Sequence, residues 1–512
     1  MGRKNMRIAA LVLCMAAFAV VSAFYLNKEK SFCIGVPLLS EKQTAEFDRY
    51  RKKDIAEEIL FMDVPVAADT QTDTLYISQN MDGTTLYTEL EGLLTTAEEK
   101  YPLYFAADKA FDDFSQAVAD GHNFTLIADT LDGCYMKYNV VFTNLPVIRV
   151  TGELAYVNED ERNVYAGDIT VWNPCYATSG KYSVQNSLLE WNRRGQSTFG
   201  FDKKSWKLSL KNEDGTNNDL DFIGIDNKDD DWILNAMALD DTKVKEMFCM
   251  QLWNGLYSQT SDYNYRMSQG EYAEVVSNGK YYGLYLLQRR VDAKYLELSE
   301  DDVLLKGLKS GGSKDIADHY EIEQAACSEE AVWKMIDGIF TRNDVSMMEI
   351  RNWMDISLFI DFGYMPDNSG YQNTFYIIKN AEGNPQISLT LWDTDYTFGI
   401  GWGTDGFAYK PEGAAENRRY RLEDEAMRIV YPQLDDMLAE RWFQLRKGIL
   451  SEENIFRLIA ENEERINLCG AMERDENLWG FYYNGADSTD SLRSYITRRL
   501  PFLDEYHSKF IQ

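Results

Sequence analysis

The hydrophobic and polar positions divide the chain into an apolar leader, a strand-rich first part and a helical last part. Residues 8–26 form an apolar run. From about residue 66, short alternating segments separated by turn residues are typical of β-strands. From about residue 420, the apolar positions recur with the period of amphipathic helices that have charged faces. The pattern therefore predicts an α+β protein.

The strand and helix signals also suggest boundaries between parts of the chain. Residues 31–65 are polar, with a helical periodicity, and we expect a stalk or a leading helix there. Residues 66–145 resemble a small β-rich module. The remainder, 146–512, mixes strands with helices, among them a helix in the segment "DDTKVKEMFCMQLWNGLY" (240–257) that opens with an Asp-Asp-Thr cap. Asn278-Gly279 suits the type I′ turn of a hairpin.

One predicted strand ends in two acidic residues. In "LTLWDTDYTFG" (389–399), apolar residues alternate up to Leu391, and Asp393 and Asp395 follow. If the alternation continues, both carboxylates fall on the apolar face, where each raises the pKa of the other. A divalent cation would neutralise them, and magnesium typically takes one or two carboxylates together with substrate phosphates. A twist that lets the acids reach water or an arginine explains the pattern equally well.

The N-terminus carries a targeting signal. Arg3, Lys4 and Arg7 precede the apolar run, which is long enough to cross a bilayer as a helix of about 20 residues. We expect an uncleaved signal-anchor over residues 1–30, with cleavage after Ala23 as the alternative. Either outcome makes the protein extracytoplasmic, membrane-anchored or secreted.

The composition of the chain disfavours several kinds of partner and of catalytic or metal site. The formal net charge is −31, so a nucleic-acid partner is not expected. The chain has 3 histidines in no ligand-like spacing, which disfavours a histidine base or a histidine-rich zinc site. Its 7 cysteines form no CxxC; export permits disulfides, but such scattered cysteines are typical of free or core thiols.

Positive charge gathers in "RRGQSTFGFDKKSWKLSL" (193–210). Arg194, Lys203 and Lys204, with backbone N–H groups around the glycines, would suit phosphate oxygens. The plainer interpretation is an exposed hairpin with solvated lysines.

A loop further along the chain also contains residues suited to phosphate chemistry. In "FIDFGYMPDNSGYQNTFYIIKN" (359–380), Asp367 and Asn373 lie ahead of a strand. In kinases, a loop Asp orients the attacking hydroxyl, and an Asn and a later Asp hold magnesium on the phosphates. An Asp and an Asn in a loop are also ordinary turn residues.

Taken in order, these segments resemble the CotH kinase family, which is named for a spore coat protein and has a divergent, atypical kinase fold. The resemblance runs from about residue 145 to the C-terminus. The segments that carry it are "RGQSTFGFDKKSWKL" (194–208), "DWILNAMALDDTKVKEMF" (231–248), "VSNGKYYGLYLL" (276–287), "VLLKG" (303–307), "PDNSGYQNTFYI" (366–377) and "LWDTDYTFG" (391–399).

The resemblance implies a two-lobe kinase-like fold with a helical C-terminal part, and ATP and Mg²⁺ as cofactors. It implies that Asp367 is the catalytic-loop aspartate. It also implies two sets of binding residues: Asn373, Asp393 and Asp395 for the metal, and Arg194, Lys203, Lys204 and Lys306 for the nucleotide.

Two departures from the family pattern weaken the kinase interpretation. The loop spacing is D-x5-N rather than D-x4-N, so Asp367 is displaced or Asn368 takes its place. Arg289 stands where the family has a glutamate. We therefore expect either a kinase acting on Ser or Thr of a surface or coat protein, or a surface structural or adhesion protein that kept the fold and lost the chemistry. Binding of a carbohydrate or other small ligand by the N-terminal module is a third possibility.

Overall fold

The computed structural model describes residues 32–511 except for 17 short gaps. The gaps are 34–35, 55–58, 62–63, 79–92, 96–99, 107–113, 120–123, 153–162, 177–180, 196, 258–264, 309–315, 326, 369, 371, 402–408 and 414–422. The chain divides into two units, of which the first is Met1–Asn144 with Gly279–Tyr281 and the second Leu145–Asn278 with Tyr282–Gln512.

The first unit is rich in strands. Its sheet has the order β3-β10-β6-β5-β4-β7-β8-β9, and β9 also pairs with β10. Helix α2, Glu41–Phe47, begins at a capping box of Ser40 and Gln43. The prediction of a helix beyond this point is wrong for Ile59–Phe61, which forms β4 between β5 and β7. The remaining elements are β1 (Phe32–Cys33), β2 (Val36–Pro37), β3 (Arg51–Lys52), β5 (Val64–Asp69), β6 (Thr74–Ser78), β7 (Leu93–Thr95), β8 (Lys100–Ala106), α3 (Phe114–Ala119), β9 (Phe124–Asp129) and β10 (Cys134–Thr143).

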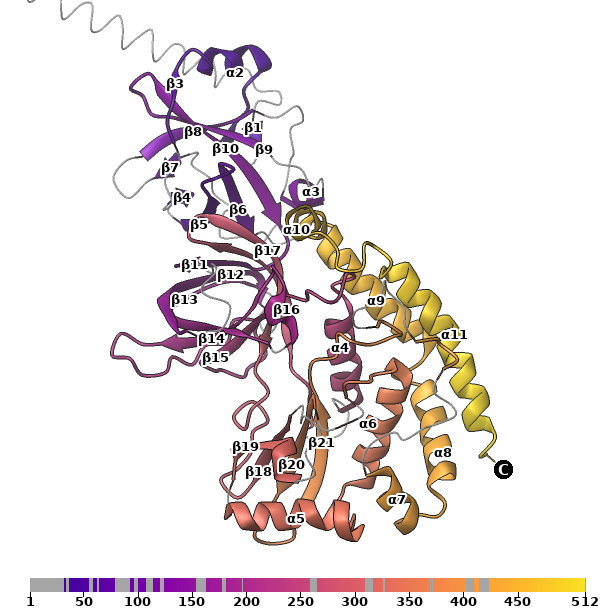
Figure 1. Ribbon diagram of the computed structural model, residues 1–512. Coiled ribbons are helices and arrows are strands. Elements are labelled where there is room, and N and C mark those ends of the chain that lie inside the picture. The colour runs from indigo at the N-terminus through magenta and orange to yellow at the C-terminus, as the bar shows by residue number, and fades with distance from the viewer. Residues whose placement is uncertain are drawn as a thin grey trace, which may run out of the picture. The chain divides into compact units, whose positions relative to one another are not determined.

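The second unit opens with a closed barrel in the order β11-β12-β13-β14-β15-β17-β16 (Figure 1). Alternation of buried and partly exposed side chains along β14 places Trp206, Leu208 and Leu210 inside. The buried Trp232 of β15 belongs to the same core. The strands are β11 (Val147–Thr151), β12 (Tyr165–Tyr176), β13 (Lys181–Arg194), β14 (Ser205–Lys211), β15 (Asp231–Asn235), β16 (Gly270–Ser277) and β17 (Lys280–Arg289).

A second sheet, in the order β19-β18-β20-β21, and a set of helices complete this unit (Figure 1). Helix α6 contacts β21 and α8, and α11 contacts α6, α8 and α9. Helix α4 contacts α9. The elements are α4 (Lys245–Tyr257), β18 (Val303–Gly307), β19 (Tyr320–Gln324), α5 (Glu329–Arg342), α6 (Ile350–Gly363), β20 (Thr374–Lys379), β21 (Gln386–Leu391), α7 (Asp424–Val430), α8 (Leu434–Arg446), α9 (Glu452–Asn467), α10 (Ala471–Trp479) and α11 (Thr489–Ser508).

The mixture of sheets and helices confirms the α+β class. No helix in the described ranges is long and apolar enough to cross a bilayer. The expected signal-anchor over residues 1–30 lies outside those ranges.

A buried carboxyl lies at the start of helix α7. Glu423 is fully buried and accepts hydrogen bonds from the Tyr376 hydroxyl and, at 3.3 Å, from Trp353 Nε1. Burial raises the pKa of Glu423 to about 7. A carboxyl with a raised pKa keeps its proton in the folded chain after the unfolded chain has lost it, so the free energy of unfolding falls as pH rises.

This linkage predicts a pH-dependent effect of Glu423→Gln. The ordinary pKa of a glutamate carboxyl is 4.5. Between pH 4.5 and about pH 7, the free energy of unfolding of the wild type should fall by about 3 kcal/mol relative to that of the variant, at 1.36 kcal/mol per pKa unit. Urea unfolding of both proteins from pH 4.5 to 7.5 measures the difference. Other buried acids titrate equally in both proteins, so parallel stability curves would contradict the assignment.

Candidate functional site

The two aspartates of the opening motif lie in a loop rather than on a strand. Strand β21 ends at Leu391, and Asp393 has a left-handed backbone with φ +58°. The prediction that the alternation continues to place both carboxylates on the apolar face is therefore wrong. Thr394 is buried instead, while Asp393 and Asp395 on either side of it are half-buried.

Thr394 is held by a glutamate from another part of the chain. Its backbone N–H and its hydroxyl both donate to Oε2 of Glu246, at 2.6 and 2.8 Å. Glu246 lies in the first turn of α4 and is almost fully buried. No motif in the sequence indicated this partner; the only local signal was an acidic residue four positions after the predicted Asp-Asp-Thr cap.

The start of α4 is fixed by the cap that the sequence predicted. Asp240 accepts hydrogen bonds from the backbone N–H groups of Thr242 and Lys245, at 3.0 and 2.8 Å. Lys245 Nζ also pairs with Asp487 at 2.5 Å. Attraction to Asp487 and Asp240 outweighs the effect of burial and raises the pKa of Lys245. Glu246 therefore stands on a rigidly anchored helix end.

Arg194, at the end of β13, supplies positive charge to the same place. Its guanidinium lies over the Trp392 ring, 4.5 Å from the centroid. Burial lowers the pKa of Arg194, and the charges of Asp393, Glu246 and Asp395 oppose that shift. We call Arg194, Glu246, Asp393 and Asp395 the acidic site.

Burial and mutual repulsion perturb all three carboxyls of the acidic site. Burial raises the pKa of Glu246 to about 7, with the charge of Asp393 adding to the effect. Burial also raises the pKa of Asp393, against the attraction of Arg194. The pKa of Asp395 is raised well above its usual range, by burial and by the charges of Asp393 and Glu246. Arg194 thus faces three carboxyls whose pKa is raised, and Lys245 adds its charge near Asp395.

The loop after α6 meets the end of β21 through two asparagines. Asn373 Nδ2 donates to the Asp393 carbonyl at 3.4 Å. Asn368 is buried, and its Nδ2 donates to the carbonyls of Asn373 and Trp392, at 3.0 and 3.1 Å. Asp367 is half-buried in the turn just before it. The structure thus brings Asn373 to Asp393.

The three lysines expected at the nucleotide contact acids or backbone carbonyls of the chain itself. Lys203 is buried; its Nζ donates to the Leu284 carbonyl and pairs with Asp475 of α10 at 2.7 Å. Burial lowers the pKa of Lys203 to about 8, against the attraction of Asp475. Lys204 donates to the backbone carbonyls of Phe199 and Phe201. Lys306 lies 3.7 Å from both Glu321 and Glu323.

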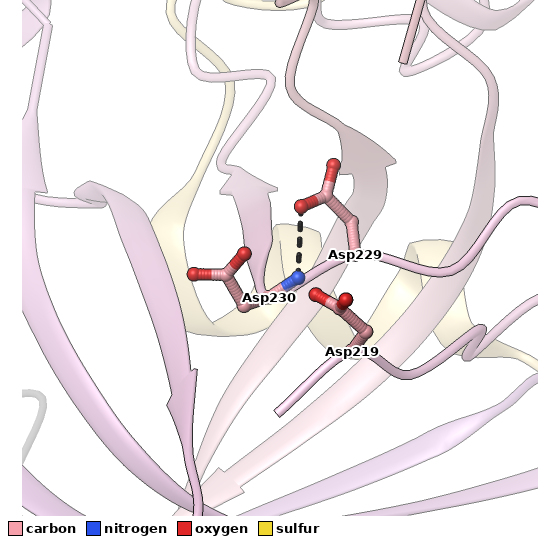
Figure 2. A group of neighbouring side chains, drawn as sticks. All are labelled: Asp219, Asp229 and Asp230. Atoms are coloured by element: carbon pink, nitrogen blue, oxygen red, sulfur yellow. Dashed lines mark hydrogen bonds between the residues drawn. The ribbon is translucent and has the colours of Figure 1, made fainter. Parts of the chain in front are cut away.

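A tighter group of carboxylates occurs elsewhere in the described part of the chain. Asp219, Asp229 and Asp230 present oxygens within 4.8 Å of one another (Figure 2). The ammonium of Lys294 pairs with Asp219 and lies 3.4 and 3.6 Å from carboxylate oxygens of Asp229 and Asp230. A side-chain cation therefore already compensates this group.

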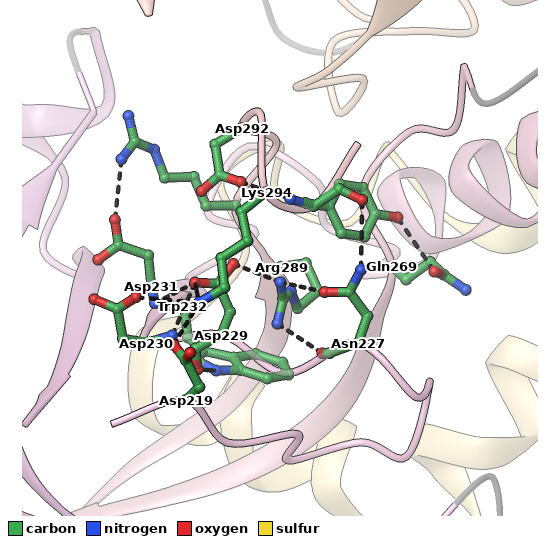
Figure 3. A network of polar contacts seen from close by, with 12 residues as sticks. Asp219, Asn227, Asp229, Asp230, Asp231, Trp232, Gln269, Arg289, Asp292 and Lys294 are labelled. Atoms are coloured by element: carbon green, nitrogen blue, oxygen red, sulfur yellow. Dashed lines mark hydrogen bonds and ion pairs between the residues drawn. The ribbon is translucent and has the colours of Figure 1, made fainter. Parts of the chain in front are cut away.

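Arg289, which replaces the family's glutamate, belongs to this same network. Its guanidinium is buried, pairs with Asp229 at 2.5 Å and donates to Asn227 (Figure 3). It also lies over the Trp232 ring, 4.9 Å from the centroid. Arg289 is thus a structural ion-pair partner in the barrel wall.

The acidic site and the Asp219 group differ in how their carboxyls are compensated, and this difference bears on magnesium binding. Magnesium is typically bound through one or two carboxylates together with substrate phosphates and water. Asp393 and Asp395 offer two half-buried carboxyls beside Arg194, whereas the Asp219 group already pairs with Lys294 and Arg289.

The comparisons with known proteins cover the part of the chain that contains this site. A family model described as "CotH kinase protein" matches residues 192–503. The match includes Arg194, Glu246, Asp367, Asn373 and Asp393. A search of the curated proteins finds no match.

The buried pair Arg289–Asp229 predicts coupled losses of stability. Arg289→Met removes the buried ion-pair partner of Asp229 and should lower the free energy of unfolding by about 3–5 kcal/mol. Asp229→Asn removes the partner of Arg289 and should lower it by a similar amount. The double variant should lose clearly less than the sum of the two single losses. Urea unfolding of the four proteins measures this.

Arg457→Met serves as the control. Its side chain is 52% exposed and pairs with the exposed Glu461 outside this network, so the variant should cost under about 1 kcal/mol. Additive losses in the double variant would show that Arg289 and Asp229 do not act as a pair.

Proposed function

The chain belongs to the CotH kinase family, and from that premise we propose that residues 146–512 form an atypical protein kinase. It transfers the γ-phosphate of ATP, with magnesium, to a Ser or Thr hydroxyl of a cell-surface or coat protein. The acidic site is the observation that carries this proposal, because it joins an arginine and three carboxyls from β13, α4 and the loop after β21. Phosphoryl transfer needs these two kinds of charge close together.

The residues have distinct proposed roles. Asp393, Asp395 and Asn373 hold magnesium, and Arg194 contacts phosphate oxygens. Bound magnesium would offset the negative charge that develops on the phosphate oxygens. Asp367 accepts the proton of the substrate hydroxyl while the hydroxyl oxygen bonds to the γ-phosphorus. The bond between the γ-phosphorus and the β-phosphate oxygen breaks, and ADP is released.

The architecture of the second unit supports a division into two lobes. The barrel β11–β17 would correspond to the first lobe, and the sheet β18–β21 with helices α5–α11 to the second. Arg194 comes from the barrel, while Asp393 and Asn373 come from the second sheet and its loops. Lys306 stands on β18 of that sheet and stays a proposed nucleotide contact.

The basic leader and apolar run support an extracytoplasmic location, with residues 1–30 as the membrane attachment. Such a location would expose the kinase to surface or coat proteins.

A second function is favoured by the lysines of the basic segment. Lys203 is committed to Asp475, and Lys204 to backbone carbonyls, so neither side chain is placed for a phosphate. A protein of this family that keeps the fold and binds nucleotide without transferring phosphate would serve as a surface structural or adhesion protein.

The kinase proposal predicts that ATP with Mg²⁺ raises the thermal unfolding temperature of the full chain. It also predicts transfer of label from γ-labelled ATP to the chain itself or to a surface-protein extract. Asp393→Asn should abolish the thermal shift and lower transfer by at least about 100-fold, as expected for loss of a charge-stabilising group.

Asp219→Asn is the matched control, because it removes one carboxylate charge outside the acidic site. Its thermal shift and transfer should match the wild type. Wild-type protein as inert and unshifted as Asp393→Asn would rule out the kinase. A magnesium-dependent shift without transfer would favour the structural or adhesion function.

A further inference from the structure

Thr394 is held at two of its atoms by a residue from another element. One carboxylate oxygen of Glu246 receives both its backbone N–H and its hydroxyl, at 2.6 and 2.8 Å. Because hydrogen bonds to a charged acceptor are about twice as strong as neutral ones, this double contact fixes both the backbone and the rotamer of Thr394. The positions of Asp393 and Asp395, each one peptide away, follow from it.

The left-handed backbone of Asp393 makes such a restraint necessary. A non-glycine residue in this conformation costs roughly 1–3 kcal/mol and persists only where its surroundings enforce it. The carbonyl of Asp393 accepts from Asn373 Nδ2 at 3.4 Å, and the next residue is tied to Glu246. The loop is therefore held from both sides of the strained residue.

Glu246 is suited to this task because its own position is fixed. It directly follows Lys245, whose N–H donates to Asp240 and whose ammonium pairs with Asp487. Its side chain is only 1% exposed, so water does not compete for its oxygens. Its charge also lies near that of Arg194, which stacks on the Trp392 ring.

We propose that Glu246 is a positioning residue that holds Asp393 and Asp395 for a divalent cation through its two hydrogen bonds to Thr394. The proposal rests on the proposed function, since it concerns the same site. It differs from the lysine–glutamate pairing of protein kinases, because here the glutamate grips the metal-binding loop itself. Glu246 need touch neither the cation nor the nucleotide.

The test is the affinity of the full chain for Mn²⁺, used as a probe for Mg²⁺ and measured without nucleotide by electron paramagnetic resonance. Glu246→Ala removes both hydrogen bonds to Thr394. Thr394→Val removes only the hydrogen bond that the Thr394 hydroxyl donates. Each should weaken Mn²⁺ binding by about 10- to 100-fold, as is typical when a group that orients a metal ligand is lost. Thr394→Ser keeps both donors and should bind Mn²⁺ as the wild type does.

A control separates positioning from general destabilisation. Glu274 is buried in the barrel and pairs with Arg474 at 2.7 Å, so Glu274→Gln should lower the unfolding temperature and leave Mn²⁺ affinity unchanged. All measurements are made well below each variant's unfolding temperature.

The outcomes distinguish this proposal from the proposed function. Mn²⁺ affinity that is equal in the wild type, Glu246→Ala and Thr394→Val would overturn the positioning role and leave the kinase untouched. Weakened binding in these variants, rescued by Thr394→Ser, would support it even if the wild type transfers no phosphate. A wild-type chain that binds no Mn²⁺ without nucleotide would overturn the positioning role, while the proposed kinase function is decided by the separate test with ATP and Mg²⁺.

Discussion

The compensation of buried negative charge is the constraint on which this structure depends. A carboxylate removed from water costs several kcal/mol unless a cation or hydrogen-bond donors replace the lost solvent. In a chain with 83 acidic and 52 basic residues, buried cations are therefore committed to particular acids. The buried pairs include Arg289–Asp229, Lys203–Asp475, Lys245–Asp487, Arg441–Asp355 and Arg499–Asp361.

The acidic site departs from this one-to-one pairing. Three carboxyls from α4 and the loop after β21 lie around Arg194, with Lys245 adding its charge near Asp395, and the pKa of each carboxyl is raised. Elsewhere a comparable crowd of acids, Asp219, Asp229 and Asp230, has Lys294 and Arg289 beside it. The difference explains why we assign a cation to the looser group and a structural role to the tighter one.

The need to compensate buried carboxylates also explains where the lysines of the segment 193–210 lie in the fold. A cluster of positive charge in an acidic chain looks like a phosphate site when only the sequence is considered. In the folded chain Lys203 neutralises Asp475 on α10, 272 positions away. Burial of that carboxylate needed a cation, and the sequence gives no sign of a pairing at such a separation.

Local patterns were sufficient for several elements, with β4 as an exception, and insufficient for the contacts between elements. The alternation along β14 and the Asp240 cap of α4 were readable, because each depends on residues a few positions apart. Asn278 and Gly279 both have positive φ, 48° and 68°, as a type I′ turn requires. The alternation failed at Asp393, where the backbone turns left-handed. The contact from Glu246 to Thr394 spans 148 positions and follows only from the packing of α4 against that loop.

The extra residue in the loop before β20 acquires a physical meaning from Asn368. If Asn368 stood for the family's aspartate, the spacing to Asn373 would be the usual four residues. The Asn368 side-chain N–H group, however, donates to the carbonyls of Asn373 and Trp392. In addition, an amide oxygen is not basic enough to accept the proton of a hydroxyl. Asn368 thus links the loop to the end of β21 by hydrogen bonds, and Asn373 in turn donates a hydrogen bond to the Asp393 carbonyl. With both of these residues anchored, the insertion need not shift Asn373, and the half-buried Asp367, directly before Asn368, remains the proposed acceptor of the substrate proton.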